Sequence, residues 1–232
     1  MELTTLIPEI LGTVAFSASG AMIGVRKNMD LLGIAVLGLV TAAGGGVIRD
    51  LVLGIHPPML FLNPIYAILA LVTAIVMFFP NVRRFSEEKQ LIYNRVHFFM
   101  DTIGLAVFTV SGIRTAYDIS HDYSTFLLVF VGVITGVGGG VLRDVLAGEP
   151  PYIFVKHFYA SPCVVGSIVC LVLWESVGRI PAMLIGSAVI MILRWLAAHY
   201  RWNLPHVPAA LYAVPPVCEH KADDWEVPKK KK

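Results

Sequence analysis

Two Arg-Asp pairs lie inside stretches of this 232-residue chain that are otherwise apolar, Arg49-Asp50 and Arg143-Asp144. A charge at the centre of an apolar membrane helix costs roughly 2.5–3.5 kcal/mol on insertion scales, so such charges are kept where they are paired or used. An arginine there can bind a carboxylate or set the electrostatic barrier of an ion pathway. The alternative is that each Arg, lying near the end of its stretch, reaches the lipid headgroups.

The partners of these charges can be predicted from helix geometry. Neighbouring residues of a helix point about 100° apart, so we expect neither Arg to pair with the Asp beside it. Pairs across the two stretches are the better hypothesis, Arg49 with Asp144 and Arg143 with Asp50. Such pairs would hold the two stretches together inside the protein.

A glycine triplet precedes each Arg-Asp pair, Gly44-Gly45-Gly46 in the first stretch and Gly138-Gly139-Gly140 in the second. Each glycine costs a helix about 1 kcal/mol relative to Ala. The triplets therefore predict a break or kink in both helices, facing protein or a water-filled cavity because lipid does not tolerate free backbone groups. The alternative is close helix packing, which small residues permit.

Other polar residues lie at matched positions in two further apolar stretches. Glu9 and Asp101 stand at the starts of these stretches, where an acidic group favours the helix dipole or helps to form a ring that attracts cations. Hydroxyl groups further along can bond to the carbonyl four residues earlier or line a pore. These residues are Ser17, Ser19, Thr109 and Ser111.

The composition requires that lipid surrounds the elements that carry these residues. Hydrophobic residues make up 56% of the chain, charged residues only 15%, and the mean hydropathy is +0.73. A soluble protein has about a quarter of its residues charged. The net charge of +2, without basic residues interleaved with aromatic ones, argues against a nucleic-acid partner.

Seven stretches are long and apolar enough to predict membrane-spanning helices, which need about 20 residues. The first is not a signal peptide, because no Lys or Arg precedes it. The residues from Arg201 onward are polar, rich in proline and end in four lysines, which predicts a disordered tail. The predicted spans are Pro8–Val25, Leu31–Leu53, Pro64–Phe79, Val96–Ala116, Thr125–Leu146, Phe158–Val177 and Pro181–Ala198.

The distribution of cations predicts the orientation in a cell (inner) membrane that the chain crosses several times. Arg26 and Lys27 follow the first span, Arg83, Arg84, Lys89 and Arg95 follow the third, and the tail ends in lysines. The opposite side has Arg114 and Arg179. Because cytoplasmic loops carry the excess of Lys and Arg, we expect the N-terminus outside and the C-terminus in the cytoplasm.

An internal repeat accounts for the matched positions. Thr41–Asp50 reads TAAGGGVIRD and Thr135–Asp144 reads TGVGGGVLRD, an offset of 94 residues. One helix earlier, Glu9–Gly20 and Asp101–Gly112 share an acidic residue followed by G, F and SG at the same spacing, at an offset of 92 residues. Two matches in the same order at nearly one offset indicate a duplicated unit.

Each repeat contains three predicted spans, and an odd number places the second copy upside down in the bilayer. The sequence thus predicts an all-α membrane protein of seven helices, with two inverted three-helix repeats and a seventh helix. We divide it into residues 1–94, the first repeat with its basic connection; 95–178, the second repeat; 179–200, the seventh helix; and 201–232, the tail.

Nothing in the sequence indicates an enzyme. It lacks HExxH, Walker A and GxSxG motifs, and its glycine-rich segments follow no predicted strand. The three cysteines, Cys163, Cys170 and Cys218, are odd in number and have no CxxC spacing, which argues against a disulfide framework or a zinc site. We expect no catalytic residue, bound metal or cofactor.

The doubled GGGVxRD motif and the acidic-xxG-xxxF-xxSG helices resemble the prokaryotic branch of the trimeric intracellular cation (TRIC) channel family, also labelled the glycine transporter family. The resemblance covers about residues 5–198. It implies a homotrimer in the lipid bilayer, in which each protomer has its own hourglass pore between the repeats. The pore would conduct monovalent cations, chiefly potassium and also sodium, and lipid could be bound. The resemblance assigns the pore shape to the glycine triplets and the pore charges to the two Arg-Asp pairs.

The residues leave two other functions open. A helix that restarts after a glycine break presents a positive dipole end next to an Arg, which repels cations and attracts a carboxylate. The alternative is therefore a secondary transporter of glycine or another small amino acid. A membrane protein without transport activity would have a dry apolar interior, which the repeated Arg, Asp and Ser positions argue against.

Overall fold

The computed structural model describes residues 3–79, 90–155, 158–200 and 202, and these residues form helices, turns and connections without strands. Of the predicted tail, residues 201–232, the structure describes Trp202. The helices are α1 (Leu3–Arg26), α2 (Leu31–Val52), α3 (Met59–Leu62), α4 (Ile65–Phe78), α6 (Gln90–Ile119), α7 (Thr125–Leu146), α8 (Tyr152–Val155), α9 (Ser161–Val177) and α10 (Arg179–His199).

Five of the described helices are long and apolar enough to cross a membrane: α1, α2, α6, α7 and α10. The helices α4 and α9 are apolar but shorter, with 14 and 17 residues. Each of the seven predicted spans overlaps one of these seven helices. The agreement follows from the length of the apolar stretches, which is the signal from which the spans were predicted.

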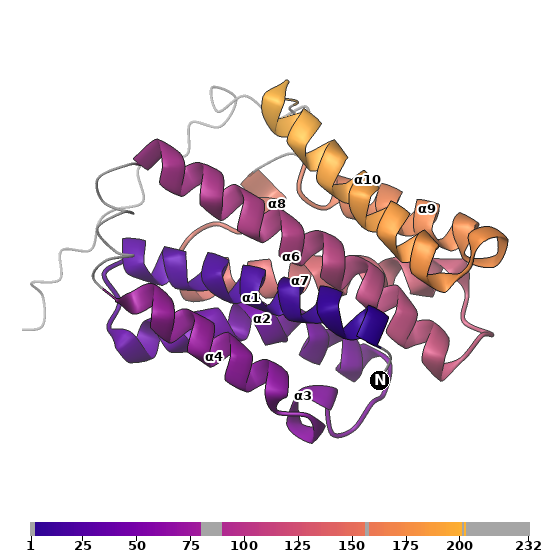
Figure 1. The fold of residues 1–232 in the computed structure, drawn as a ribbon, viewed down its shortest axis with the longest axis horizontal. Helices are drawn as coiled ribbons and strands as arrows, with labels where there is room; N and C mark the ends of the chain where they lie inside the picture. The colour runs from indigo at the N-terminus through magenta and orange to yellow at the C-terminus, as the bar shows by residue number, and fades with distance from the viewer. Residues whose placement is uncertain (1–2, 80–89, 156–157, 201, 203–232) are drawn as a thin grey trace, which may run out of the picture.

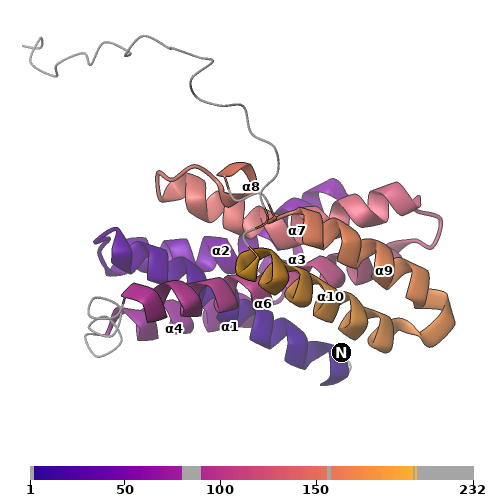
Figure 2. The same cartoon turned by 90° about the horizontal axis from the view of Figure 1, so that it is seen from above.

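The helices pack as two layers. One layer runs α4, α1, α6, α10, and the other runs α2, α7, α9, with α1 against α2 and α6 against α7 between the layers (Figures 1 and 2). In Figure 1, α1 runs from right to left and α6 beside it runs from left to right. The centre of the molecule is therefore made by α1, α2, α6 and α7, the helices that carry the matched motifs.

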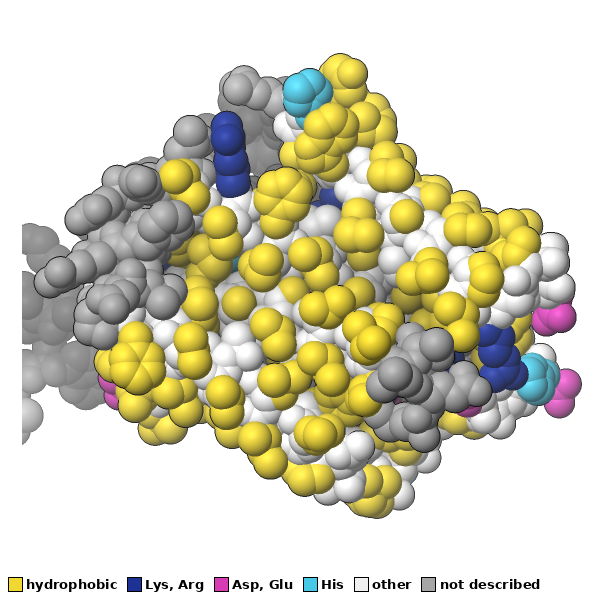
Figure 3. All heavy atoms as spheres, viewed as in Figure 1, with side chains coloured by type: hydrophobic (Ala, Val, Ile, Leu, Met, Phe, Trp, Pro, Cys, Tyr) yellow, Lys and Arg dark blue, Asp and Glu magenta, His cyan; other side chains and the backbone are white. Residues whose placement is uncertain are grey.

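The surface of this bundle is apolar over its length. Large hydrophobic side chains such as Ile68 and Val72 on α4 and Ile192 on α10 are more than half exposed. Figure 3 shows apolar side chains over most of one face, with charged side chains at its edges. Such a surface fits a lipid environment, since soluble proteins rarely expose continuous apolar patches of this size.

Local signals begin and end the two central helices in the same way. Asp30 accepts a bond from Gly33 N at 2.7 Å at the start of α2, and Ser124 accepts one from Leu127 N at 3.3 Å at the start of α7. Beyond their last turns, Gly54 (φ 73°) and Gly148 (φ 67°) adopt the left-handed conformation that ends a helix. Equivalent N-terminal caps and terminal glycines thus set the length of both helices.

The glycine triplets do not break these helices. Both α2 and α7 continue through them as α-helix, so the predicted breaks are wrong. The glycines allow close packing instead: a Cβ on Gly45 would overlap the carbonyl oxygen of Thr135, and a Cβ on Gly139 would overlap that of Thr41. Close packing between helices outweighs the low helix propensity of glycine. This is the alternative interpretation of the triplets given by the sequence.

Equivalent residues of the two repeats also meet in the other layer. The rings of Phe16 on α1 and Phe108 on α6 stack with their centroids 5.3 Å apart. Gly104 leaves room for this contact, because a Cβ there would overlap the Phe16 ring. The contacts of Gly45 with Thr135, of Gly139 with Thr41 and of Phe16 with Phe108 are all reciprocal between the repeats.

We predict that Gly45→Ala destabilises the protein and that Gly46→Ala does not. A methyl group on Gly45 meets a backbone carbonyl that cannot move away, which typically costs about 1–3 kcal/mol. On Gly46 it would meet only Arg49 Nη2, at 3.8 Å. The measurement is the midpoint of thermal unfolding in detergent, and equal midpoints for the two variants would contradict the packing role of Gly45.

Candidate functional site

Two cavities are lined by charged and polar side chains. The first, which we name the Arg49 cavity, has a volume of about 390 Å³, and the second, the Arg194 cavity, has about 370 Å³. Charged and hydroxyl side chains lining the Arg49 cavity include Glu9, Arg49, Asp50, Tyr66, Ser111, Arg114 and Asp118. Polar and aromatic side chains lining the Arg194 cavity include Arg26, Asn94, His97, Asp101, Tyr152, Tyr159 and Arg194.

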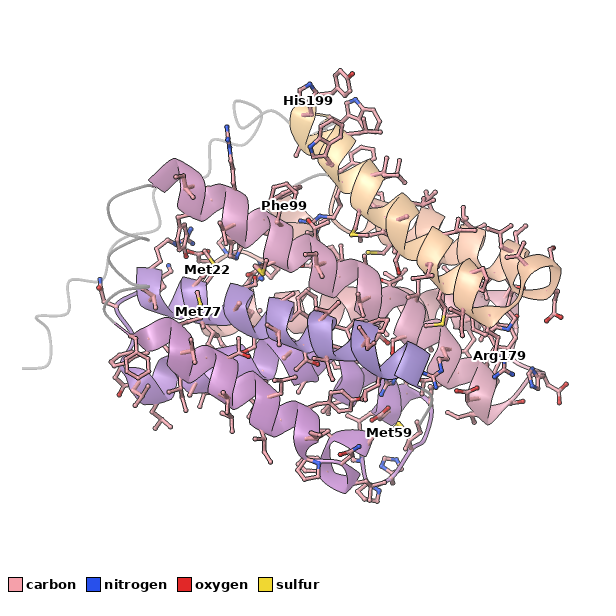
Figure 4. All side chains as sticks on the ribbon, in the orientation of Figure 1. Met22, Met59, Met77, Phe99, Arg179 and His199 are labelled. Carbon is pink, nitrogen blue, oxygen red and sulfur yellow. The ribbon has the colours of Figure 1, made fainter. Side chains whose placement is uncertain are left out.

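The two cavities lie at opposite ends of the bundle. The Arg49 cavity is lined by the first turns of α1 and the last turns of α6, and the Arg194 cavity by the reverse ends of the same helices. In Figure 4, Met59 of the Arg49 cavity lies near the end where α10 begins at Arg179. His199, at the other end of α10, lies at the opposite end. The contact between α2 and α7 at Gly45 and Gly139 and the Phe16–Phe108 stack lie between the two cavities along the helices.

Each Arg pairs with its own neighbouring Asp, so the predicted pairs across the repeats are wrong. Arg49 Nε donates to Asp50 Oδ1 at 2.8 Å, and Arg143 Nε donates to Asp144 Oδ1 at 2.9 Å. In both pairs an Nη2 lies within 2.9 Å of the same oxygen. The prediction considered the directions of the Cβ atoms, but the long arginine side chain folds back to reach its neighbour.

The second oxygen of each Asp holds the start of a short helix. Asp50 Oδ2 accepts a bond from Met59 N at 2.8 Å, and Asp144 Oδ2 accepts one from Tyr152 N at 2.9 Å. These nitrogens belong to the first residues of α3 and α8. Each Asp therefore links an arginine to a four-residue helix whose first residue lines a cavity, and it satisfies a free N–H group there.

Arg143 is the most deeply buried charge of the described residues, with a fully buried side chain. Its Nη1 donates to Ser19 Oγ and to Asp101 Oδ1, both at 2.7 Å. Tyr159 also donates to Asp101 Oδ1, at 3.2 Å. The structure thus brings together three predicted residues of different helices, Ser19, Asp101 and Arg143, in one network.

Arg194 on α10 completes this network, although it was not among the predicted site residues. Its Nη2 lies 3.1 Å from Asp101 Oδ2, and its guanidinium lies over the Tyr159 and Phe98 rings at 4.6 and 5.2 Å. His97, also absent from the prediction, has its Nε2 3.2 Å from Ser19 Oγ. An arginine inside the predicted span Pro181–Ala198 is a signal of a functional residue, because charges are rarely kept in membrane helices. Arg194 lies outside the repeats, so the comparison of equivalent residues did not identify it.

The Arg49 end is arranged differently. Glu9, which matches Asp101, accepts bonds from Tyr66 at 2.6 Å and from Ser111 at 3.2 Å, and lies 3.5 Å from Arg114. Arg49, which matches Arg143, is held by Asp50, and within the described residues its hydrogen bonds go to no residue of α1 or α6. The arginine of this end is thus free of the network that fixes Arg143.

The remaining predicted residues contribute to packing or to the cavity wall. Ser17 donates to Ala70 O of α4 at 2.6 Å, and Thr109 donates to Leu105 O within α6 at 2.7 Å. Both hydroxyls are therefore bonded to helix backbone. Of the two glycine triplets, Gly46 lines the Arg49 cavity. Gly44, Gly138 and Gly140 lie against neighbouring helices or, for Gly140, against the Tyr159 hydroxyl.

A comparison with known protein families finds a match to the family described as "Glycine transporter", over residues 6–81 and 98–175. The two matched segments contain the two repeats. Among curated relatives, the UPF0126 inner membrane protein YadS of Escherichia coli is 35% identical over 201 residues, covering 85% of this chain and 93% of its own length. The membrane protein YvgT of Bacillus subtilis is 32% identical over 201 residues, covering 85% and 94%.

Solved structures of similar chains are cation channels. One, from a study of conductance through TRIC cation channels, is 39% identical, with a TM-score of 0.74, and the match covers 87% of this chain and 96% of that chain. Another is the TRIC trimeric intracellular cation channel orthologue from Rhodobacter sphaeroides, 31% identical with a TM-score of 0.78, covering 87% and 100%. With its apolar helices, the chain is a multi-pass membrane protein.

We predict that Asp101→Asn lowers stability far more than Glu9→Gln, although the two residues are equivalent in the repeat. Loss of the Asp101 charge leaves Arg143 and Arg194 with a single buried carboxylate, Asp144, which typically costs about 3–5 kcal/mol. Glu9 is 23% exposed and its partners are mostly neutral. Thermal unfolding in detergent is the measurement, and similar losses for both variants would show that the network does not depend on charge.

Proposed function

The chain belongs to the glycine transporter family, and because its similar solved structures are TRIC cation channels, we propose that it is a channel for monovalent cations, chiefly potassium, in the cell membrane. The observation that carries this proposal is the pair of charged cavities at opposite ends of one closely packed centre. The proposed path joins the two cavities within each protomer. By analogy with the trimeric relative, the assembly is a homotrimer.

We infer further that α1, α2, α4 and α6, α7, α9 are inverted repeats and that α10 is the seventh membrane helix. The reciprocal contacts of Gly45 with Thr135 and of Gly139 with Thr41 support a two-fold relation between the repeats. The opposite directions of α1 and α6 in Figure 1 support it too. The axis would pass through the Phe16–Phe108 stack.

The proposed path is narrowest at this axis. Phe16 and the glycines that pack against neighbouring backbone fill the space between the cavities, so conduction requires a movement there. On one side of it, Arg143 is fixed by Ser19 and Asp101. Because a fixed positive charge repels cations, this arginine must be neutralised by its carboxylates or displaced when potassium passes.

A carrier of glycine is the second hypothesis, and its main argument depended on broken helices. Without a break, α2 and α7 present no new positive helix end beside Arg49 and Arg143. Both arginines are also already bound to carboxylates of the chain. A substrate carboxylate would have to displace these partners, which makes the channel the better supported function.

Single-channel recording of the purified protein in planar bilayers with a potassium gradient tests the proposal. We expect resolved unitary currents that reverse near the potassium equilibrium potential. Arg143→Gln should change the open probability or unitary conductance more than Arg49→Gln, because Arg143 alone bonds to α1 and α6 within the described residues. Glycine uptake into proteoliposomes without unitary currents would establish the carrier instead.

We also predict that the N-terminus lies outside the cell and the C-terminus in the cytoplasm, as the loop charges indicate. The test is labelling of intact cells with a membrane-impermeant maleimide in two single-cysteine variants. Asp122→Cys, between α6 and α7, should be labelled, and Lys89→Cys, before α6, should react after the cells are lysed. The opposite pattern would reverse the proposed topology.

A further inference from the structure

Arg194 introduces a difference between the two ends of the molecule that the repeats alone would not contain. It lies on α10, outside the two segments that match each other and outside the residues that match the family. Its side chain is 6% exposed and lines the Arg194 cavity. Among the described residues that line the Arg49 cavity, no arginine comes from α10; the exposed Arg179 of α10 lies outside the cavity and pairs with Asp118 at 3.0 Å.

The charges at the two cavities differ as a result. The Arg49 cavity is lined by three carboxylates, Glu9, Asp50 and Asp118, and by two guanidinium groups, Arg49 and Arg114. Arg179 lies 3.0 Å from Asp118, so three positive charges balance three negative charges at this end. The Arg194 cavity is lined by one carboxylate and two guanidinium groups. With their ion partners counted, this end has four positive and three negative charges, an excess of one positive charge when its histidine is neutral; the partners are Lys27, Glu149, Arg143 and Asp144.

The positive charge of Arg194 is incompletely matched within the described structure. Its ion pair with Asp101 joins Nη2 to Oδ2 at 3.1 Å, but Asp101 is shared with Arg143. The Nε and Nη1 atoms of Arg194 make no hydrogen bond, and the guanidinium lies instead against the rings of Tyr159 and Phe98. Aromatic faces stabilise a cation but do not cancel its field in the cavity.

We propose that Arg194 makes the cation current directional, so that potassium passes more easily from the Arg49 cavity to the Arg194 cavity than in reverse. This inference rests on the proposed path through both cavities. A positive mouth lowers the local cation concentration and a balanced mouth does not, so ions entering from the Arg194 end meet the larger barrier. Arg194 is thus the residue that sets the direction of the preferred current.

The test uses symmetric KCl and voltages of equal size and opposite sign. It measures the ratio of the current that enters from the Arg49 end to the current that enters from the Arg194 end. The wild-type channel should rectify at 0.1 M KCl and rectify less at 1 M, where charges are screened within about 3 Å. Arg194→Gln should raise the current that enters from the Arg194 end by about twofold and bring the ratio toward one. Arg194→Lys should keep the wild-type ratio, because it keeps the charge.

Two further variants separate a charge effect from a structural one. Arg95→Gln removes a cation that is exposed on the same end of α6 and lines neither cavity, so it should leave the ratio unchanged. Asn94→Asp adds a carboxylate to the Arg194 cavity without changing Arg194 and should lower the ratio as Arg194→Gln does. This variant decides the question if Arg194→Gln fails to fold.

The sidedness of each recorded channel is read from a cysteine at Asn63, which lines the Arg49 cavity, in a background with Cys218 replaced by Ser. A membrane-impermeant thiol reagent then reacts from the Arg49 side alone. Wild-type channels that conduct without rectifying, or an unchanged ratio in both Arg194→Gln and Asn94→Asp, would overturn the role of Arg194. An absence of unitary currents in the wild type would instead overturn the proposed channel function.

Discussion

The matching of charge inside a bilayer is the constraint on which the centre of this structure depends. A buried guanidinium without a carboxylate is strongly unfavourable, and Arg143 is surrounded by the groups that remove this cost. Ser19, Asp101 and Asp144 come from three helices, so satisfying one arginine fixes the positions of α1, α6 and α7 relative to one another. Asp144 extends the same constraint to α8 through the backbone of Tyr152.

The glycine contact between α2 and α7 makes this arrangement of charges possible. The backbones of the two helices touch at Gly45 and Gly139, where neither helix leaves room for a Cβ. The arginines stand four residues beyond these glycines, one turn farther along each helix. Arg49 lines the Arg49 cavity, and Arg143 is fully buried beside Asp101, which lines the Arg194 cavity. The close contact thus separates the two Arg-Asp pairs, one toward each cavity.

The helices could be predicted from the sequence because lipid imposes a length of apolar residues that is visible without any knowledge of packing. The glycine triplets predicted broken helices, and the helices are continuous, since helix propensity is local and does not include the backbone of the neighbouring helix. The pairing of Arg49 with Asp50 was missed because spacing describes where side chains begin, not where a long side chain ends. Arg194 was missed because the repeat directed attention to residues that occur twice.

Duplication and asymmetry therefore have separate origins in this fold. The backbone features occur in both repeats: the glycine contact, the helix ends at Gly54 and Gly148, and the Asp that holds a short helix. The charges do not, because Glu9 is held mainly by neutral hydroxyls whereas Asp101 is held by two arginines. A duplicated scaffold alone would treat both directions of transport alike. The seventh helix, by adding Arg194 to one mouth, is the element that can distinguish them.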